Sequence, residues 1–271
     1  MEQPPKLPLL TLNERRDLVY AKLLLENPGL TARLAQVLGS PIEKGLKMLP
    51  ANFSELVQKA TRTALNRALD VAIATIGGKN PRRSSERFHK LLAGAAGGIG
   101  GIFGLASLPL ELPVSTAIML RSIADIARSE GHDLGTVEVK LDCLEVFALG
   151  SKGANAAESG YWAVRTALAR AVAEAASYAA EKGVLDKSAP VMIRLVGSIA
   201  ARFGIVVSEE VAAKAVPIIG AASGSVINVL FINHFQDMAR GHFIVRRLER
   251  IYGTENVREE YLNLPAALVK R

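Results

Sequence analysis

Two long stretches without a charged residue most constrain how this chain can fold. They are LLAGAAGGIGGIFGLASLPL at residues 91–110 and AVPIIGAASGSVINVLFINHFQ at residues 215–236. Each matches the ~20 residues that a helix needs to cross the apolar core of a bilayer. Each also carries small residues four positions apart, a spacing that lets helix backbones approach closely. The sequence therefore predicts helix packing through Gly94, Gly97, Gly98, Gly100, Gly101, Gly104, Gly220 and Gly224.

The composition favours an all-α fold. Hydrophobic residues make up 49% of the 271 residues, but aromatic residues make up only 5%. A core of Ala, Leu, Ile, Val and Gly suits close packing of helices more than an aromatic-rich sheet. We therefore expect a helical bundle whose central layer is the two glycine-rich apolar helices, each an element of a hairpin. The expected parts are N-terminal helices in residues 1–85, a core of residues 86–253 and a tail of residues 254–271, within one compact domain.

Proline, glycine and capping residues divide the chain into helices. Asn13 can cap a helix that stops at Pro28, and an amphipathic helix follows over residues 52–76. Pro109 and Pro113 should end the first apolar helix, so that a return arm begins near Val114. Further helices are predicted at residues 136–149, 156–182 and 190–203 and from residue 208, and the second apolar stretch should continue into a charged amphipathic helix.

Basic residues precede the first apolar stretch. The formal net charge of the chain is +7, and Arg82, Arg83, Arg87 and Lys90 stand in a segment where Glu86 is the only opposing charge. Cationic side chains beside an apolar helix favour the anionic cytoplasmic leaflet of a membrane. These four basic residues are therefore the candidate membrane-binding residues. The expected partner is anionic lipid or a membrane transport complex.

The cysteine content and the N-terminus indicate a cytoplasmic protein. Cys143 is the only cysteine, which excludes an intramolecular disulfide and a cysteine-based zinc cluster. Its apolar neighbours in LDCLEVFALG indicate a buried side chain rather than a nucleophile. The first residues, MEQPPKLPLL, lack the continuous apolar core of a secretory signal. We expect the chain in the cytoplasm or bound peripherally to the inner membrane.

No nucleotide-binding motif is complete. In GAAGGIGGIFG, Gly98 and Gly100 fit the first two positions of the dinucleotide fingerprint, but Phe103 stands at the third and no strand precedes it. The arginines near the C-terminus are interrupted by acidic residues and have few aromatic neighbours for base stacking. We therefore expect no cofactor and no nucleic acid.

The histidine spacing does not predict a metal site. His234, Asp237 and His242 lack the i, i+4 spacing of a helical zinc site, and the Glu-x-x-His pattern of di-iron bundles is absent. A site that combined an acidic residue such as Glu111, Asp125 or Glu145 with His234 would exist only through the fold. No metal is expected on the sequence alone.

Polar residues near the apolar helices leave the alternative of an enzyme open. The candidate polar cluster consists of Arg121, Asp125, Glu145, Asn228, His234 and Asp237. The plainer interpretation of two of them is an ion pair along one helix, because Arg121 and Asp125 stand four positions apart. No catalytic residue is assigned.

Three stretches together resemble the EcsC family of bacterial proteins. They are the glycine-rich helix that leads to LPLELPVSTAIMLRSIADIARSEGHDL, the helix LDCLEVFALG, and VPIIGAASGSVINVLFINHFQDMARGHFIVRRLERIYG near the C-terminus. The resemblance extends over residues 88–253 and implies an all-helical bacterial protein. The family takes its name from a gene beside an ABC exporter linked to secretion, and it supplies no catalytic residues.

The leading hypothesis is a non-enzymatic protein at the cytoplasmic face of the bacterial inner membrane, linked to secretion or transport. It would engage lipid or a membrane complex through the basic residues and the apolar hairpin. The alternative is a soluble helical hydrolase that uses the polar cluster. An exposed apolar hairpin with a basic rim would favour the first, and convergence of the polar cluster in a pocket would favour the second.

Overall fold

The computed structural model describes residues 10–26, 29–38, 42–47, 49–75, 108–150, 160–183, 185–215 and 222–264. Within these ranges the secondary structure is helical and no strand occurs, which confirms the predicted all-α class. The elements are α1 (Leu12–Glu26), α2 (Leu30–Leu38), α3 (Ile42–Lys47), α4 (Phe53–Thr75), α6 (Leu108–Ser129), α7 (Val137–Glu145), the 3-10 turn η2 (Val146–Ala148), α8 (Tyr161–Lys182), α9 (Pro190–Ala215), α10 (Ala222–Tyr252) and α11 (Thr254–Asn263).

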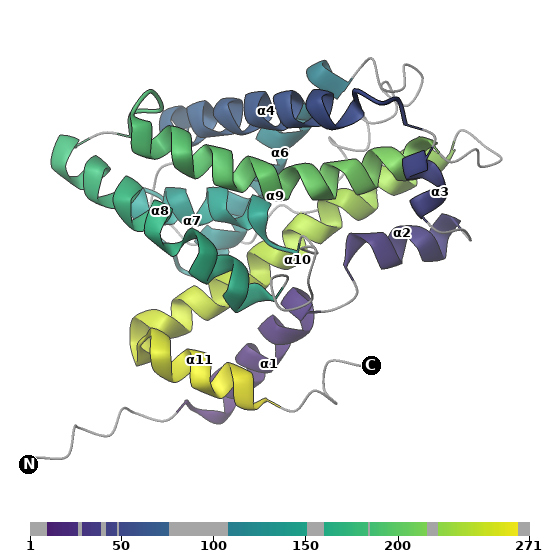
Figure 1. Cartoon of the computed structure of the whole chain (residues 1–271). Helices are drawn as coiled ribbons and strands as arrows, with labels where there is room; N and C mark the ends of the chain where they lie inside the picture. The colour runs from purple at the N-terminus through teal and green to yellow at the C-terminus, as the bar shows by residue number, and fades with distance from the viewer. Residues whose placement is uncertain are drawn as a thin grey trace, which may run out of the picture.

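The helix α10 is the longest of the described helices, at 31 residues, and it packs against α1, α2, α6, α9 and α11. Figure 1 shows α4 and α9 side by side, with α10 crossing below α9 and reaching α1 and α11 at its far end. Four phenylalanines, at positions 147, 203, 231 and 235, pack together where α9, α10 and η2 meet. The ring centroids of Phe147 and Phe203 lie 5.1 Å apart, and those of Phe203 and Phe235 lie 5.6 Å apart. Such pairs add about 0.5–1.5 kcal/mol each to the burial of their area.

Helix ends follow local capping chemistry. Thr11 and Glu14 form a capping box, because the Thr11 amide donates to Glu14 Oε2 at 2.9 Å and the Glu14 amide donates to Thr11 Oγ1 at 3.3 Å. The cap of α1 is therefore Thr11 and not Asn13. Thr136 accepts from the Val139 amide at the start of α7. Gly183 ends α8 in the left-handed conformation, as its position after the alanine-rich run predicts.

Two predicted helix breaks are wrong. The helix α6 begins at Leu108 and continues through Pro113. Pro109 lies in the first turn of the helix, where the amide has no partner within the helix in any case. The energetic cost of the two prolines is therefore limited to the one helix hydrogen bond that Pro113 cannot donate. The helix α9 also runs unbroken past Ser208, whose hydroxyl donates to the Gly204 carbonyl at 2.8 Å and does not cap a new helix.

The helices α6 and α10 run parallel. Gln236 Nε2 donates to Ser122 Oγ at 2.8 Å, and further along α10 Arg240 pairs at 3.3 Å with Glu130, the residue that follows the end of α6. Their first turns therefore lie at the same end of the bundle. The last turn of α9 lies there too, because Glu111 of α6 helps to stabilise the charge of Lys214. The two charge-free stretches of the sequence thus join the described fold at one end.

The glycines singled out in the sequence lie at or beyond the limits of what the structure describes. Residues 94–104 and Gly220 lie outside the described residues, and only the backbone of Gly224 is described, as part of α10. Close helix approach is instead visible at Gly241, where an added Cβ would lie 2.6 Å from Leu25 Cγ and 3.0 Å from the carbonyl oxygen of Ala21. This glycine lets α1 pack directly on α10. The charged residues around it in the sequence did not indicate such a close helix contact.

Candidate functional site

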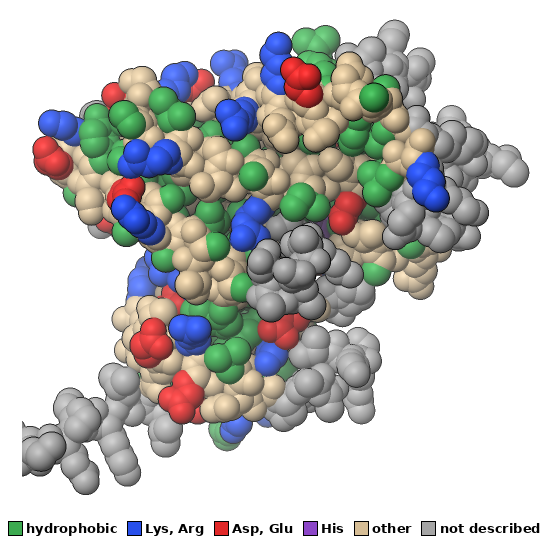
Figure 2. Space-filling model, viewed as in Figure 1, with side chains coloured by type: hydrophobic (Ala, Val, Ile, Leu, Met, Phe, Trp, Pro, Cys, Tyr) green, Lys and Arg blue, Asp and Glu red, His purple; other side chains and the backbone are tan. Residues whose placement is uncertain are grey.

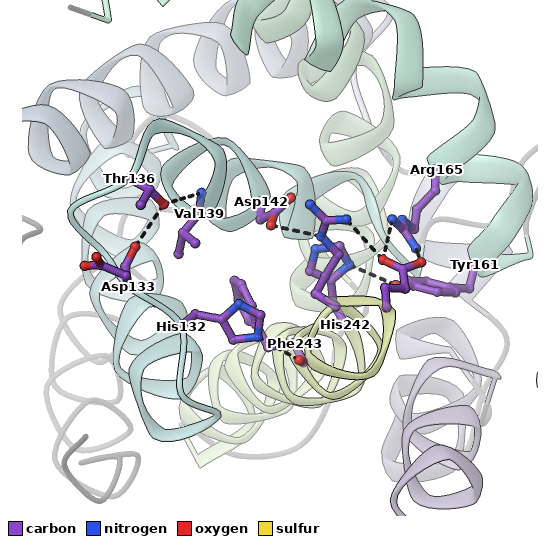
Figure 3. Close-up of polar contacts among 11 residues, drawn as sticks. His132, Asp133, Thr136, Val139, Asp142, Tyr161, Arg165, His242 and Phe243 are labelled. Carbon is purple, nitrogen blue, oxygen red and sulfur yellow. Dashed lines mark hydrogen bonds and ion pairs between the residues drawn. The ribbon is translucent and has the colours of Figure 1, made fainter. Parts of the chain in front are cut away.

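A set of charged residues lies between α7, α8 and α10, with its carboxyl groups buried and its arginines partly buried. We call it the ionic cluster, and Figure 3 shows most of its members with their contacts. Helix periodicity explains how the sequence brings them together, since residues three or four apart share one face. The members are Asp142 and Glu145 of α7, Arg165 of α8, and Arg246 and Glu249 of α10, flanked by Tyr161 and His242.

Glu249 is the centre of the ion pairing. Arg165 donates to both of its carboxylate oxygens, at 2.6 and 3.1 Å, and Arg246 donates to Oε2 at 3.0 Å. Arg246 also donates through Nε to Asp142 Oδ2 at 3.0 Å. Hydrogen bonds between two charged groups are roughly twice as strong as those between neutral groups, and a bidentate pair also fixes the relative orientation of its partners. The cluster holds three buried carboxyl groups against two guanidinium groups, so its charge is incompletely balanced.

Burial shifts the acidity of the cluster. Glu145 is only 5% exposed, and its burial, with the nearby Asp142 carboxylate, raises its pKa to about 7. Burial also raises the pKa of Asp142, although the Arg246 guanidinium opposes the shift. A carboxyl group with a pKa near neutrality can hold or release a proton at physiological pH. Glu145 is therefore the group of the cluster best suited to proton exchange.

His242 lies beside these carboxyl groups. Its Nδ1 is 3.1 Å from the Tyr161 hydroxyl, and its Nε2 is buried without a hydrogen-bond partner. Burial, with the nearby Arg165 guanidinium, lowers the pKa of His242 well below the usual value, so the ring is neutral. Asp142, Glu145 and His242 each place a potential ligand atom within 4.8 Å of the others.

A pocket of about 370 Å³ opens beside the ionic cluster. Its lining includes Asp142, Glu145, Trp162, Arg165, Arg246 and Arg258. The Arg165 guanidinium lies over the Trp162 ring at 5.0 Å from the centroid, and this cation–π contact helps to hold the arginine in place. The cluster is thus buried and still has a path to its surroundings.

The six residues of the predicted polar cluster do not come together in the structure. Only Glu145 belongs to the ionic cluster. Arg121 is exposed, and Asp125 accepts from Arg128 at 3.4 Å on the same helix. Asp237 pairs with Arg33 of α2 at 2.8 Å.

The two remaining predicted residues are buried on α10. Asn228 is 4% exposed, and His234 is 2% exposed. His234 is hydrogen bonded to the Leu149 backbone carbonyl, and its ring fills the space in front of Gly150. Burial, with the nearby Arg33 guanidinium, lowers the pKa of His234 to about 4.

The stability contribution of His234 should depend on pH. The pKa of about 4 in the folded state lies below the ~6.5 of an unfolded chain, so only the unfolded chain takes up a proton between these values. The stabilisation is complete above about pH 6.5 and is lost as the pH falls towards 4. The advantage of wild type over His234→Gln in unfolding free energy should shrink by about 2 kcal/mol between pH 7.5 and 5. Urea unfolding of both proteins at the two pH values measures it, and a constant difference would contradict it.

Sequence reasoning missed most of the ionic cluster. Asp142 lies between Leu141 and Cys143, and both neighbours are fully buried. Cys143 is buried as predicted, and burial raises its pKa well above the usual value. An acidic residue inside such an apolar run was the available signal, because a buried carboxylate needs a cationic partner. The identity of that partner, Arg246, follows only from the fold.

The basic residues Arg82, Arg83, Arg87 and Lys90 lie outside the described residues. Among the described helices, α9 is long and apolar enough to span a membrane, with a mean hydropathy of 1.7. Half of that window is buried inside the protein, so length and composition alone are weak evidence for a span. Figure 2 shows Lys and Arg side chains scattered among apolar ones over α4, α8 and α9 on the visible face.

The chain belongs to the EcsC protein family, since the model of that family matches residues 22–248. The match begins well before residue 88, so it also takes in the last third of α1 and all of α2, α3 and α4. Comparison with curated proteins and with solved structures gave no significant match. The family is therefore established, and the activity has to be argued from the site.

Proposed function

We propose that this protein binds the cytoplasmic face of the bacterial inner membrane peripherally, through the end of the bundle where α6 and α10 begin. The proposal commits to anionic lipid as the partner. The family resemblance to a protein encoded beside an ABC exporter fits a role at a membrane linked to secretion or transport. No step of catalysis is part of this role.

The main observation in support of this proposal is that large apolar side chains are exposed at this end of the bundle. Leu110 is 78% exposed and Val114 is 55% exposed on the first two turns of α6, and Val226 is 42% exposed near the start of α10. Exposed apolar groups that gather at one end of a protein mark an interaction surface. The charge-free stretches 91–110 and 215–236 lead directly into these turns.

The basic residues support an electrostatic component. Arg82, Arg83, Arg87 and Lys90 immediately precede the first charge-free stretch in the sequence. Each basic residue near an anionic surface contributes about 1 kcal/mol to membrane binding, and salt screens that attraction. Binding should therefore need anionic lipid and weaken at high salt.

Flotation with vesicles of neutral or anionic lipid tests the proposal. We expect wild type to float with anionic vesicles at low salt, and the double variant Leu110→Glu/Val114→Glu to lose most of that binding. The matched control is Ile193→Glu/Ile251→Glu, which changes two residues of similar exposure, 59% and 57%, at the other ends of α9 and α10. Because all four side chains are exposed, both variants should keep the wild-type helical circular dichroism.

The basic residues are tested separately by changing Arg82, Arg83, Arg87 and Lys90 together to Gln. Salt-sensitive binding should be lost in this variant. Absence of wild-type binding to every vesicle, or equal loss in the Ile193/Ile251 control, would overturn the proposal. Carbonate-resistant binding would replace peripheral association with insertion.

A further inference from the structure

We propose that Asp142, Glu145 and His242 form a binding site for a divalent transition-metal ion between α7 and α10. This site is separate from the membrane-binding end and does not depend on it. One ligand atom from each residue lies within 4.8 Å of the other two. Atoms that bind zinc at ~2.0–2.2 Å lie ~3–4 Å from one another, so a small side-chain movement closes the site.

His242 supplies the second and independent observation. Its Nε2 is fully buried and has no hydrogen-bond partner in the protein, although a buried polar atom normally has one. Its Nδ1 lies 3.1 Å from the Tyr161 hydroxyl. With the proton on Nδ1 donated to Tyr161, Nε2 carries the free lone pair that a metal needs. A partner on the second ring nitrogen is the usual way in which proteins orient a histidine ligand.

The charges around the site also favour a cation. Glu249 receives hydrogen bonds from both Arg165 and Arg246, whereas Asp142 is bonded to Arg246 through Oδ2. The two guanidinium groups can therefore offset the charge of only two of the three carboxyl groups when all three are ionised. A divalent ion between Asp142 and Glu145 would supply the missing positive charge.

The donor set indicates which kind of ion fits. One imidazole and two carboxylates suit zinc, manganese or ferrous iron, whereas calcium and magnesium prefer oxygen donors alone. Three protein ligands also leave a position for water or a substrate. The pocket of about 370 Å³ that Asp142 and Glu145 line gives the ion a path to the site.

Calorimetric titration of the full-length, metal-stripped protein with zinc chloride tests the site. We expect one zinc ion per chain and no comparable heat with magnesium chloride. His242→Gln and Glu145→Gln should each weaken zinc binding by at least ~100-fold, because loss of a ligand exceeds the 10–100-fold effect of losing an outer partner. Zinc should also raise the melting temperature of wild type and not that of either variant.

The matched control is His132→Gln. His132 is equally buried, at 3% exposure, but its Nε2 is already hydrogen bonded to the Phe243 carbonyl at 2.9 Å. This variant should bind zinc as wild type does. Circular dichroism checks each fold, and if His242→Gln fails to fold, Glu145→Gln decides the question. No stoichiometric binding by wild type, or equal binding by wild type and Glu145→Gln, would overturn the proposal.

Discussion

Replacing Arg165 with methionine should lower the free energy of unfolding by about 3–5 kcal/mol. Arg165 makes two hydrogen bonds to Glu249, whose side chain is only 3% exposed. Without Arg165, one guanidinium group remains for three buried carboxyl groups, and an uncompensated buried charge is far costlier than a lost surface pair. Urea unfolding at pH 7.5 measures the change.

The matched control for this prediction is Arg170→Met on the same helix. Arg170 also pairs with a glutamate, Glu174 at 2.8 Å, but its side chain is 92% exposed. Exposed pairs four residues apart contribute little to stability, so this variant should be nearly neutral. Adding Glu249→Gln to Arg165→Met should recover part of the loss, because it removes the stranded charge. Similar losses of unfolding free energy in Arg165→Met and Arg170→Met would contradict the prediction that the ionic cluster contributes more to stability than an exposed ion pair.

Replacing Gly150 with alanine should destabilise the protein by about 2–5 kcal/mol. Gly150 has a φ of 72°, a left-handed conformation that costs an alanine ~1–2 kcal/mol. An added Cβ would also lie 2.6 Å from Nε2 of the buried His234 ring, and such overpacking costs ~1–3 kcal/mol. Thermal and urea unfolding measure the sum of both effects.

Gly183 separates the two contributions. It has nearly the same φ, 73°, but nothing lies within 4 Å of an added Cβ. Gly183→Ala should therefore show the conformational cost alone. In a Gly150→Ala/His234→Ala double variant, the steric part should disappear, so the loss should fall short of the sum of the single losses. An equal effect of alanine at both glycines would contradict the role assigned to the His234 ring.

Local signals predicted much of the fold. The all-α class followed from composition, the end of α8 followed from Gly183, and the continuation of the second apolar stretch into a charged helix is seen in α10. These features depend on backbone preferences and periodicity within a few turns. They are therefore encoded in contiguous residues.

The ends of helices at prolines and the burial of charged residues were harder to predict from the sequence. Pro113 lies inside α6 because packing outweighs one missing hydrogen bond, and this balance is invisible to local propensity. The ionic cluster shows the same limitation, since Asp142 and Arg246 are far apart in the sequence and meet only in the fold. A charged residue on a predicted helix usually faces solvent, and only the folded structure shows that this one is buried.

The continuity of α10 gives the molecule a mechanical property. Val226 lies at the apolar end, whereas His242, Arg246 and Glu249 belong to the ionic cluster, all on one unbroken helix. At 1.5 Å per residue, His242 is ~24 Å along the helix axis from Val226. A rigid rod transmits rotation and displacement along its whole length. Under the proposed membrane binding, a tilt of the first turn of α10 at a lipid surface would therefore be carried along the helix as far as His242.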